Sequence, residues 1–331
     1  KALGKEQVVY EEKSNLNTTE EYFYRGYDKA EAKDYSGSIA DYTKAIEINP
    51  NNANAYSNRG NSKEKLKDYS GSIADYTKAI EINPNFANAY FNRGLLKETL
   101  KDYNGAIADY TKAIEINPNV AFYYGQRGST KGKLNDYYGA ISDHTKSIEI
   151  NPNQESFYYN RAICKISLND YYGIISDCTK AIEINPNWDL PYHNRGFAKS
   201  LLKDYYGAIS DYTKSIEINP NYNSYISRAE AKGELKDYYG AISDYTKAIE
   251  INPNNANNYY NIGYAKYKLK DYYGSISDYT KAIEINPNVA FYYEGRAQSK
   301  YYLNDSNGSC QDARKAQSLG HISTTVNIVC K

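Results

Sequence analysis

The sequence predicts an all-α solenoid built from nine helix–turn–helix repeats. The first observation is a period of 34 residues, shortened once to 33, that runs through most of the 331-residue chain. The second is an Asp at a fixed place in each period, a residue type that N-caps helices. The third is an Asn-Pro pair near the end of most periods, which stops a helix because proline cannot donate to the helical hydrogen-bond ladder. A fixed period of this length indicates a repeat array.

The repeats occupy residues 19–323, and short flanks precede and follow them. In the N-terminal extension, residues 1–18, the segment Gln7–Tyr10 is typical of a strand, and so is Thr325–Cys330 in the C-terminal tail, residues 324–331. We expect each strand to cover its own end of the array or to pair with a neighbouring subunit. The nine repeats are 19–52, 53–86, 87–120, 121–154, 155–188, 189–221, 222–255, 256–289 and 290–323.

Repeat two, residues 53–86, illustrates how each copy is built. Tyr56 and Gly60 have the spacing of one helical face, which predicts a first helix in the first half of the repeat. Asp68 then caps a second helix, and Pro84 stops it. The apolar side of this second helix consists of Ile73, Tyr76, Ile80 and Ile82.

This pattern resembles the tetratricopeptide repeat over nearly the whole chain. That family has an aromatic residue at repeat position 4, a small residue at position 8, Ala at positions 20 and 27, and Pro at position 32. Position 4 is Tyr in all nine copies, and position 8 is Gly or Ala throughout, as in Gly60 and Ala162. The resemblance implies a right-handed superhelix whose first helices line a concave, ligand-binding face.

Two positions depart from the family pattern and carry opposite charges. Position 7 is Arg in eight copies, and position 23 is Asp in all nine. A charged side chain at an inward position needs a partner, so we expect a ladder of structural ion pairs. A stripe that binds anions is the alternative, but an acid is available to every cation. In repeats two to four the expected pairs are Arg59 with Asp75, Arg93 with Asp109, and Arg127 with Asp143.

Tyrosine is unusually frequent, with 40 residues. Positions 17 and 18 are both Tyr in repeats four to eight, and two adjacent helix residues cannot both face inward. One Tyr per copy should therefore be exposed, either as a contact surface or as a surface residue that was multiplied when the repeat duplicated. The second residues of these pairs are Tyr138, Tyr172, Tyr206, Tyr239 and Tyr273.

Composition and spacing argue against several classes of function. Lys+Arg and Asp+Glu are both 40, a formal net charge of +0, whereas nucleic-acid-binding proteins normally have a basic excess. No apolar run approaches the roughly 18 residues of a membrane-spanning helix. His144, His193 and His321 lie in different repeats, and no two of them have metal-ligand spacing. The sequence therefore predicts no enzymatic activity, no cofactor and no metal site.

The four cysteines form two local pairs. Cys164 and Cys178 lie on the two helices of repeat five, and Cys310 and Cys330 lie near the C-terminal end. We expect two disulfides, which favour an extracellular or secreted location over the cytoplasm. The alternative is four unrelated buried thiols in a cytosolic protein. Because the chain begins at Lys1 without Met, we also expect that its natural N-terminus is missing, either through processing such as the removal of a signal peptide or through the choice of the segment.

In the tetratricopeptide family, positions 2, 5, 9, 12 and 13 line the concave face. This chain lacks the Lys and Asn set with which one subset of the family clamps a peptide carboxylate. It has apolar and aromatic residues there instead, which we expect to bind a partner, unless they pack against one another in a tightly wound array. The stripe consists of Phe91, Leu95, Phe122, Tyr159, Ile163, Ile166 and Phe197.

Two functions agree with these features. The first is a non-enzymatic scaffold that binds an extended peptide or a partner protein through its concave face. The second is a structural protein whose copies join head to tail into an extracellular filament, because the start of repeat one, at Tyr22, Phe23 and Tyr24, has no polar cap.

Overall fold

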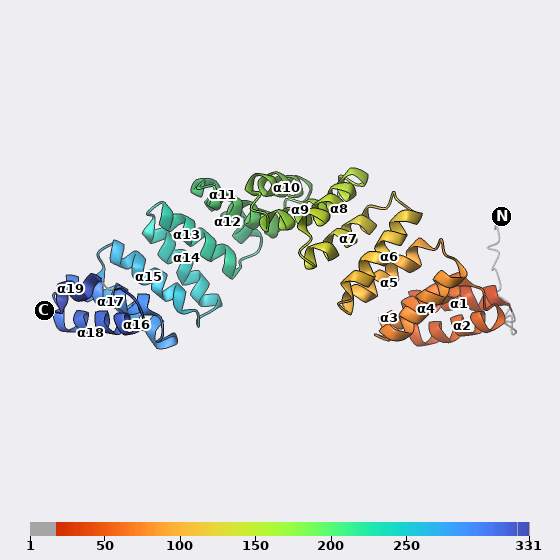
Figure 1. Ribbon diagram of the computed structural model, residues 1–331, viewed down its shortest axis with the longest axis horizontal. Helices are drawn as coiled ribbons and strands as arrows, with labels where there is room; N and C mark the ends of the chain where they lie inside the picture. Colours follow the sequence, from red (N-terminus) through yellow and green to blue (C-terminus); the bar gives the residue numbers. More distant parts are fainter. Residues whose placement is uncertain (1–17, 323, 331) are drawn as a thin grey trace, which may run out of the picture. The chain divides into compact units, whose positions relative to one another are not determined.

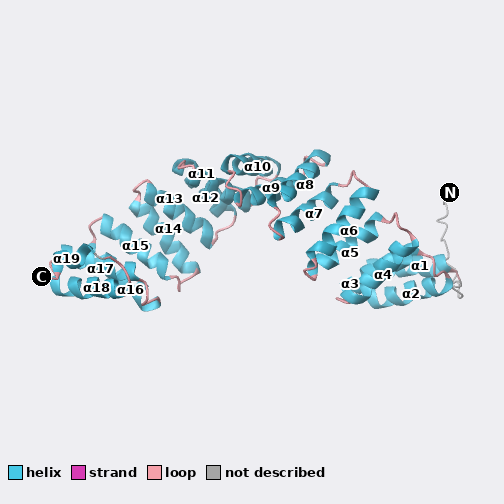
Figure 2. Ribbon diagram, in the orientation of Figure 1, coloured by secondary structure: helices cyan, strands magenta, loops and turns pink. Residues whose placement is uncertain are grey.

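The computed structural model describes residues 18–322 and 324–330. All regular elements in this part of the chain are α-helices, and Figure 2 shows no strand in it. The helices alternate between the first and the second helix of a repeat (Figure 1), which confirms the predicted all-α repeat array. The strand expected at Gln7–Tyr10 lies outside the described residues.

The chain divides into two compact units. Unit 1, Lys1–Pro152, contains the helix pairs of repeats one to four. Its helices are α1 (Thr19–Glu31), α2 (Tyr35–Ile48), α3 (Ala53–Lys65), α4 (Tyr69–Ile82), α5 (Ala87–Thr99), α6 (Tyr103–Ile116), α7 (Ala121–Lys133) and α8 (Tyr137–Ile150).

Unit 2, Asn153–Lys331, contains the helix pairs of repeats five to nine and one further short helix, α19. Its helices are α9 (Glu155–Ile166), α10 (Tyr171–Ile184), α11 (Asp189–Leu201), α12 (Tyr205–Ile218), α13 (Tyr222–Glu234), α14 (Tyr238–Ile251), α15 (Ala256–Lys268), α16 (Tyr272–Ile285), α17 (Ala290–Tyr302), α18 (Ser306–Ser318) and α19 (Thr324–Val329).

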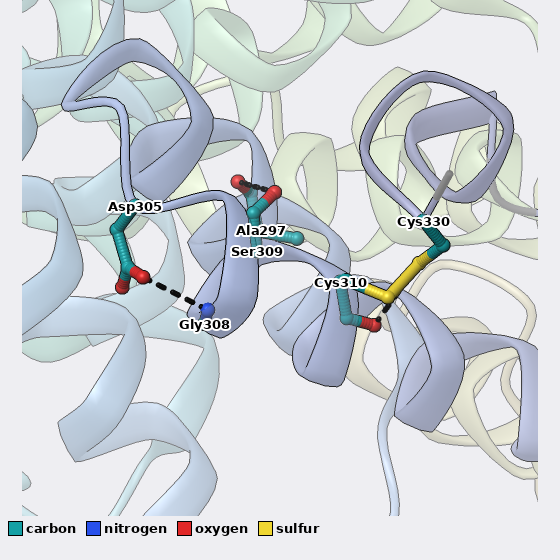
Figure 3. The surroundings of a disulfide bond; sticks show 6 residues. All are labelled: Ala297, Asp305, Gly308, Ser309, Cys310 and Cys330. Atoms are coloured by element: carbon teal, nitrogen blue, oxygen red, sulfur yellow. Dashed lines mark hydrogen bonds between the residues drawn. A yellow bond between two sulfur atoms is a disulfide. The ribbon is translucent and has the colours of Figure 1, made fainter.

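A tight turn joins the two helices of each repeat. Before the capping Asp, one residue takes a left-handed conformation, as Lys67 does with φ 64°. Asp68 Oδ1 then accepts a hydrogen bond of 3.0 Å from the Gly71 amide, which caps α4. A Cβ on Gly71 would lie 2.1 Å from Asp68 Oδ2, so a larger residue at this position must displace the capping carboxylate. The same cap recurs in the last repeat at Asp305 and Gly308 (Figure 3).

The core of a repeat lies where the position-24 side chain of the second helix crosses the small residue at position 8. Tyr76 is fully buried, and a Cβ on Gly60 would lie 3.0 Å from its ring. Small residues also let successive repeats approach, as where Ser38 Oγ lies 2.9 Å from Ser62 Oγ. Within each unit, a first helix therefore packs on its own second helix and on the second helix before it.

The paired tyrosines behave as their spacing predicts. The second tyrosine of each pair is exposed, by 75 to 77 %, while the tyrosine before it is half-buried. The prediction of one exposed Tyr per copy in repeats four to eight is confirmed, at Tyr138, Tyr172, Tyr206, Tyr239 and Tyr273.

The prediction of a strand at Thr325–Cys330 is wrong, because this segment contains helix α19. Residue 324 follows Ala290 by one period, so α19 has the register of the first turns of a tenth first helix. It packs on α17 and α18, and Thr325 Oγ1 donates a hydrogen bond of 2.6 Å to Glu294 Oε1. A disulfide joins Cys330 to Cys310 on α18 (Figure 3). These tertiary contacts outweigh the β-propensity of Thr, Val and Ile.

Candidate functional site

The charged positions inside the repeats form complete ion pairs. Arg59 donates to Asp75 from Nε at 2.9 Å and from Nη2 at 2.7 Å, and Lys63 Nζ lies 2.8 Å from the same carboxylate. Arg59 Nη1 also donates to Thr43 Oγ1 of the preceding repeat, at 3.1 Å. Each cation and each carboxylate thus has its partner within the repeat array, which leaves no free anion-binding stripe here.

The same arrangement recurs along each unit. In unit 1 the further pairs are Arg25 with Asp41, Arg93 with Asp109, and Arg127 with Asp143. In unit 2 they are Arg161 with Asp177, Arg195 with Asp211, Arg228 with Asp244, and Arg296 with Asp312. Repeat eight is the exception: Ile262 replaces the Arg, Asp278 keeps an ion pair of 2.7 Å with Lys266, and burial raises the pKa of Asp278.

We call the side of each unit formed by positions 2, 5, 9, 12 and 13 of its first helices the groove face. In unit 1, Phe91 packs between Tyr110 and Tyr123, with ring centroids 5.6 and 4.9 Å away. Leu95 is half-buried, and Phe122 is 53 % exposed. Of the residues expected in the stripe, Phe122 is therefore the exposed one in this unit.

In unit 2, too, the residues of the stripe differ in how exposed their side chains are. Tyr159 packs on Trp188 with ring centroids 4.5 Å apart, and Ile166 packs against a buried cluster that contains Cys178. Phe197 is half-buried, and Ile163 is 39 % exposed. Phe91, Tyr159 and Ile166 are half-buried as well, against rings and aliphatic groups of their own unit. Ile163 is therefore the exposed member of the stripe in unit 2, and binding of a partner by the stripe stays a prediction.

Unit 1 has a pocket of about 340 Å³ between α1 and α3, which we call the α1–α3 pocket. The buried Tyr42 lies at its base, and burial raises the pKa of Tyr42 to about 12. The charged residues of its wall are Glu31, Lys33 and Lys65. Cations therefore outnumber carboxylates in this pocket.

Unit 2 has a pocket of about 370 Å³ at the equivalent place between α13 and α15, which we call the α13–α15 pocket. The buried Tyr245 lies at its base, and burial raises the pKa of Tyr245. Its charged wall residues are Glu230, Glu234 and Lys236, so carboxylates outnumber cations here. Its remaining polar and aromatic wall residues are Tyr238, Asn261 and Tyr264.

Neither pocket was predicted from the sequence. A signal was present, because Glu230 is the one charged residue at position 9 among the nine repeats. That signal could not be interpreted from the sequence, since a carboxylate on a helix surface is ordinary until its distance from every cation is known.

Family models match the sequence of the repeats. Models of the tetratricopeptide repeat (TPR) match residues 53–86, 87–120, 256–289 and 191–222, and a further TPR model matches 26–67 and 231–270. Together these segments cover more than half of the chain. The chain belongs to the tetratricopeptide repeat family. No curated protein is a significant match to the sequence.

Solved TPR structures share the fold at low sequence identity. YrrB, described as a TPR protein with an unusual peptide-binding site, has 22 % identity and a TM-score of 0.52 over 58 % of this chain and 97 % of its own. The C-terminal part of a Cytophaga hutchinsonii TPR protein has 19 % identity and a TM-score of 0.61, over 70 % and 95 %. A TPR protein of Parabacteroides merdae has 21 % identity and a TM-score of 0.53, over 71 % and 93 %.

Two histidines of this TPR chain, His144 and His193, pack within the repeat array. His144 is buried at position 24, where most repeats have Tyr. His193 Nδ1 lies 3.0 Å from Ser224 Oγ, and burial lowers the pKa of His193. Among the described residues, no group of three His, Cys, Asp or Glu side chains could hold a metal ion. None of the described helices is long and apolar enough to cross a bilayer.

One of the two expected disulfides is present. Cys310 and Cys330 are bonded, whereas Cys164 and Cys178 are free thiols, so the predicted Cys164–Cys178 bond is wrong. The reason is the TPR geometry. Cys178, at position 24 of the second helix, packs against Ala162 at position 8 of the first helix. Cys164 lies two residues after Ala162 on that first helix, so its side chain points about 200° away from that of Ala162. Burial raises the pKa of both thiols, that of Cys178 to about 12.

Proposed function

We propose that this TPR protein is a non-enzymatic scaffold that binds an extended peptide or a segment of a partner protein on its groove face. The main support is how the repeats differ from one another. Helices α2 and α4 have the same sequence, YSGSIADYTKAIEI, whereas the first helices beside them, TEEYFYRGYDKAE and ANAYSNRGNSKEK, differ at most positions. A surface that varies among copies of one framework can present a distinct set of contacts at each repeat.

The charge distribution supports the same proposal. The Arg, Lys and Asp of the ion-pair ladder are occupied by one another, as at Arg93, Lys97 and Asp109. They maintain the framework and are not available to a ligand. The side chains that a ligand can reach are the exposed groove-face residues, such as Phe122 and Ile163, and the walls of the two pockets. The fold is shared with YrrB, whose description names a peptide-binding site.

The test is selection of peptides from a random display library on the whole protein, followed by affinity measurements on the selected peptides. Phe122→Ser and Ile163→Ser should each weaken a peptide that contacts its unit, by about tenfold or more for a central contact. Tyr138→Ser and Tyr172→Ser are matched controls in the same two repeats, because these tyrosines are exposed on second helices. The proposal is contradicted if the control variants lose the peptides and the groove variants keep them.

A head-to-tail filament is the other function compatible with the sequence. Its support is weaker at the C-terminal end, because α19 packs on α17 and α18 of its own chain and is fastened there by the Cys310–Cys330 disulfide. That surface is thus covered by the chain itself. Sedimentation velocity over a range of concentrations distinguishes the two functions: a scaffold keeps one sedimentation coefficient, whereas a filament grows with concentration.

A further inference from the structure

The wall of the α13–α15 pocket contains two carboxylates and one lysine, so acids outnumber cations in it. Glu230 and Glu234 have no hydrogen bond and no ion pair within the described part of the chain. Other acids of the same repeat have partners: Asp244 bonds Arg228 and Lys232, and Glu250 bonds Lys247. Both glutamates are exposed in the wall of the pocket, so a cation that enters the pocket can reach their carboxylates.

Unit 1 shows what a groove-face carboxylate binds when a cation is present. Glu98 Oε1 lies 2.7 Å from Lys133 Nζ, which comes from position 13 of the next repeat. Glu98 Oε2 accepts a hydrogen bond of 2.7 Å from the Tyr110 hydroxyl. An ammonium group from a neighbouring helix thus completes this site.

In unit 2 the corresponding lysine is placed elsewhere. Lys268, at position 13 of repeat eight, has its Nζ over the ring of Tyr264 at 5.1 Å and over the ring of Tyr267 at 5.9 Å. It does not form an ion pair with Glu230 or Glu234. Tyr264 is at the same time a wall of the pocket, so the wall already presents an aromatic face of the kind that attracts cations.

The pocket has free space beside the two acids. Gly233 lines it, and a Cβ added to Gly233 would meet no atom within 4 Å. Repeats eight and nine have Tyr267 and Tyr301 at this position. Repeat seven therefore lacks, at position 12, the large side chain that its two successors carry.

We infer that the α13–α15 pocket binds the cationic side chain of a peptide, arginine or lysine, between Glu230 and Glu234 and against the ring of Tyr264. This inference rests on the proposed function and specifies its ligand. The planar fork of arginine can donate to two carboxylates and stack on a ring at once, so arginine is the better ligand. Among the residues that line the pocket, Lys236 offsets one of the two acids, so the lining keeps a net negative charge.

The α1–α3 pocket of unit 1 can be compared directly with the α13–α15 pocket of unit 2. It has the same place between two first helices and a similar volume, but Glu31 is accompanied there by Lys33 and Lys65. With two cations and one acid in its wall, it should not select a basic side chain. The pockets also differ at position 9, where unit 1 has Tyr27 and Asn61 and unit 2 has Glu230 and Tyr264. The acid at position 9 of the earlier helix and the ring at position 9 of the later helix are therefore specific to unit 2.

The experiment is an NMR titration of the full-length protein with the N-methylamide of Nα-acetylarginine, and with the matching citrulline derivative, which is neutral and of nearly the same shape. The arginine probe should shift the amide resonances of Gly233 and Asn261, and citrulline should not. Removing both charges, in Glu230→Gln with Glu234→Gln, should weaken arginine binding by about tenfold or more. Equal shifts with citrulline, or unchanged binding to the double variant, would overturn the inference.

A second variant removes the pocket without touching the acids. Gly233→Tyr introduces the residue that repeats eight and nine carry at this position, so the helix should tolerate it, and arginine binding should be lost. Glu31→Gln in unit 1 is the matched control and should leave binding unchanged. If Gly233→Tyr binds the probe normally, the inference is wrong. The proposed function is tested separately, since selected peptides can bind the groove face and be lost in Phe122→Ser while the arginine probe fails.

Discussion

Arg93 holds Asp109 through two hydrogen bonds, from Nε at 2.9 Å and from Nη2 at 2.7 Å, across the two helices of repeat three. Lys97 adds a third contact of 2.8 Å to the same carboxylate, which is almost fully buried. A buried carboxylate with all its partners maintains the geometry of the helix pair, and removing one partner leaves the others uncompensated.

Asp109→Asn should therefore destabilise the protein by about 3 kcal/mol. Arg93 and Lys97 would keep their charges and lose the anion between them. The measurement is the midpoint of urea unfolding followed by circular dichroism. The matched control is Asp278→Asn, which should cost less, because Asp278 has no Arg partner and burial raises its pKa. Equal losses for the two variants would contradict a specific role for the Arg–Asp pair.

The helix pairs and their ion pairs follow from the sequence for a physical reason. Each inward position is sampled nine times, so a charge such as Asp109 that recurs at one position must have a recurring partner. The alternation of Asp caps and Pro stops adds boundaries that do not depend on distant contacts. Local rules therefore suffice to predict the framework.

The features that the sequence did not predict depend on contacts between helices. A strand was predicted in the tail from its β-branched residues, but α17, α18 and the bond to Cys310 stabilise a helix there. The sequence left open whether Phe91 faces solvent or packs within the array, and in the structure it is half-buried against Tyr123 of the next repeat. Glu230 is an ordinary surface acid in the sequence, and it is distinctive only because Lys268 lies over Tyr264.

Replacing glycine with alanine should have opposite effects on protein stability at Gly71 and at Gly233. Gly71→Ala places a Cβ 2.1 Å from Asp68 Oδ2 and must displace the cap of α4, at a cost of about 1 kcal/mol or more. Gly233→Ala meets no atom within 4 Å and should stabilise α13 by roughly 0.5 kcal/mol through helix propensity. Thermal unfolding of both variants checks the pair. Stabilisation by Gly71→Ala would contradict the role of the carboxylate as a cap.

Thiol titration should find two reactive cysteines in the unfolded, unreduced protein, because Cys164 and Cys178 are free and the other two are bonded. In the folded protein both should react slowly, since they are buried and their raised pKa values keep them protonated at neutral pH. Alkylation followed by mass spectrometry identifies the sites. Finding Cys310 or Cys330 among the labelled residues would contradict the tail disulfide.

The ionised carboxylate of Glu230 in the α13–α15 pocket should make the unliganded protein less stable at neutral pH. Protein around Glu230 partly desolvates its carboxyl and raises its pKa above the value of about 4.3 expected in an unfolded chain. The groups around it include Glu234, Lys236, Tyr245 and Tyr264. Because the folded state binds this proton more tightly than the unfolded state does, ionised Glu230 lowers stability above its folded pKa. The penalty disappears as the pH falls below the unfolded value.

Glu230→Gln should therefore unfold at a higher temperature than the parent protein at pH 7, and the difference should shrink as the pH is lowered through the raised pKa of Glu230. Glu250→Gln is the control, because Glu250 is exposed and bonds Lys247 at 2.8 Å, and it should show no such gain. Saturating arginine probe should stabilise the parent protein more than the variant, since only the parent offers both carboxylates. A lower melting temperature for Glu230→Gln at pH 7 would mean that the folded protein already supplies a partner for this acid, and the pocket would then have no need of a cation from outside.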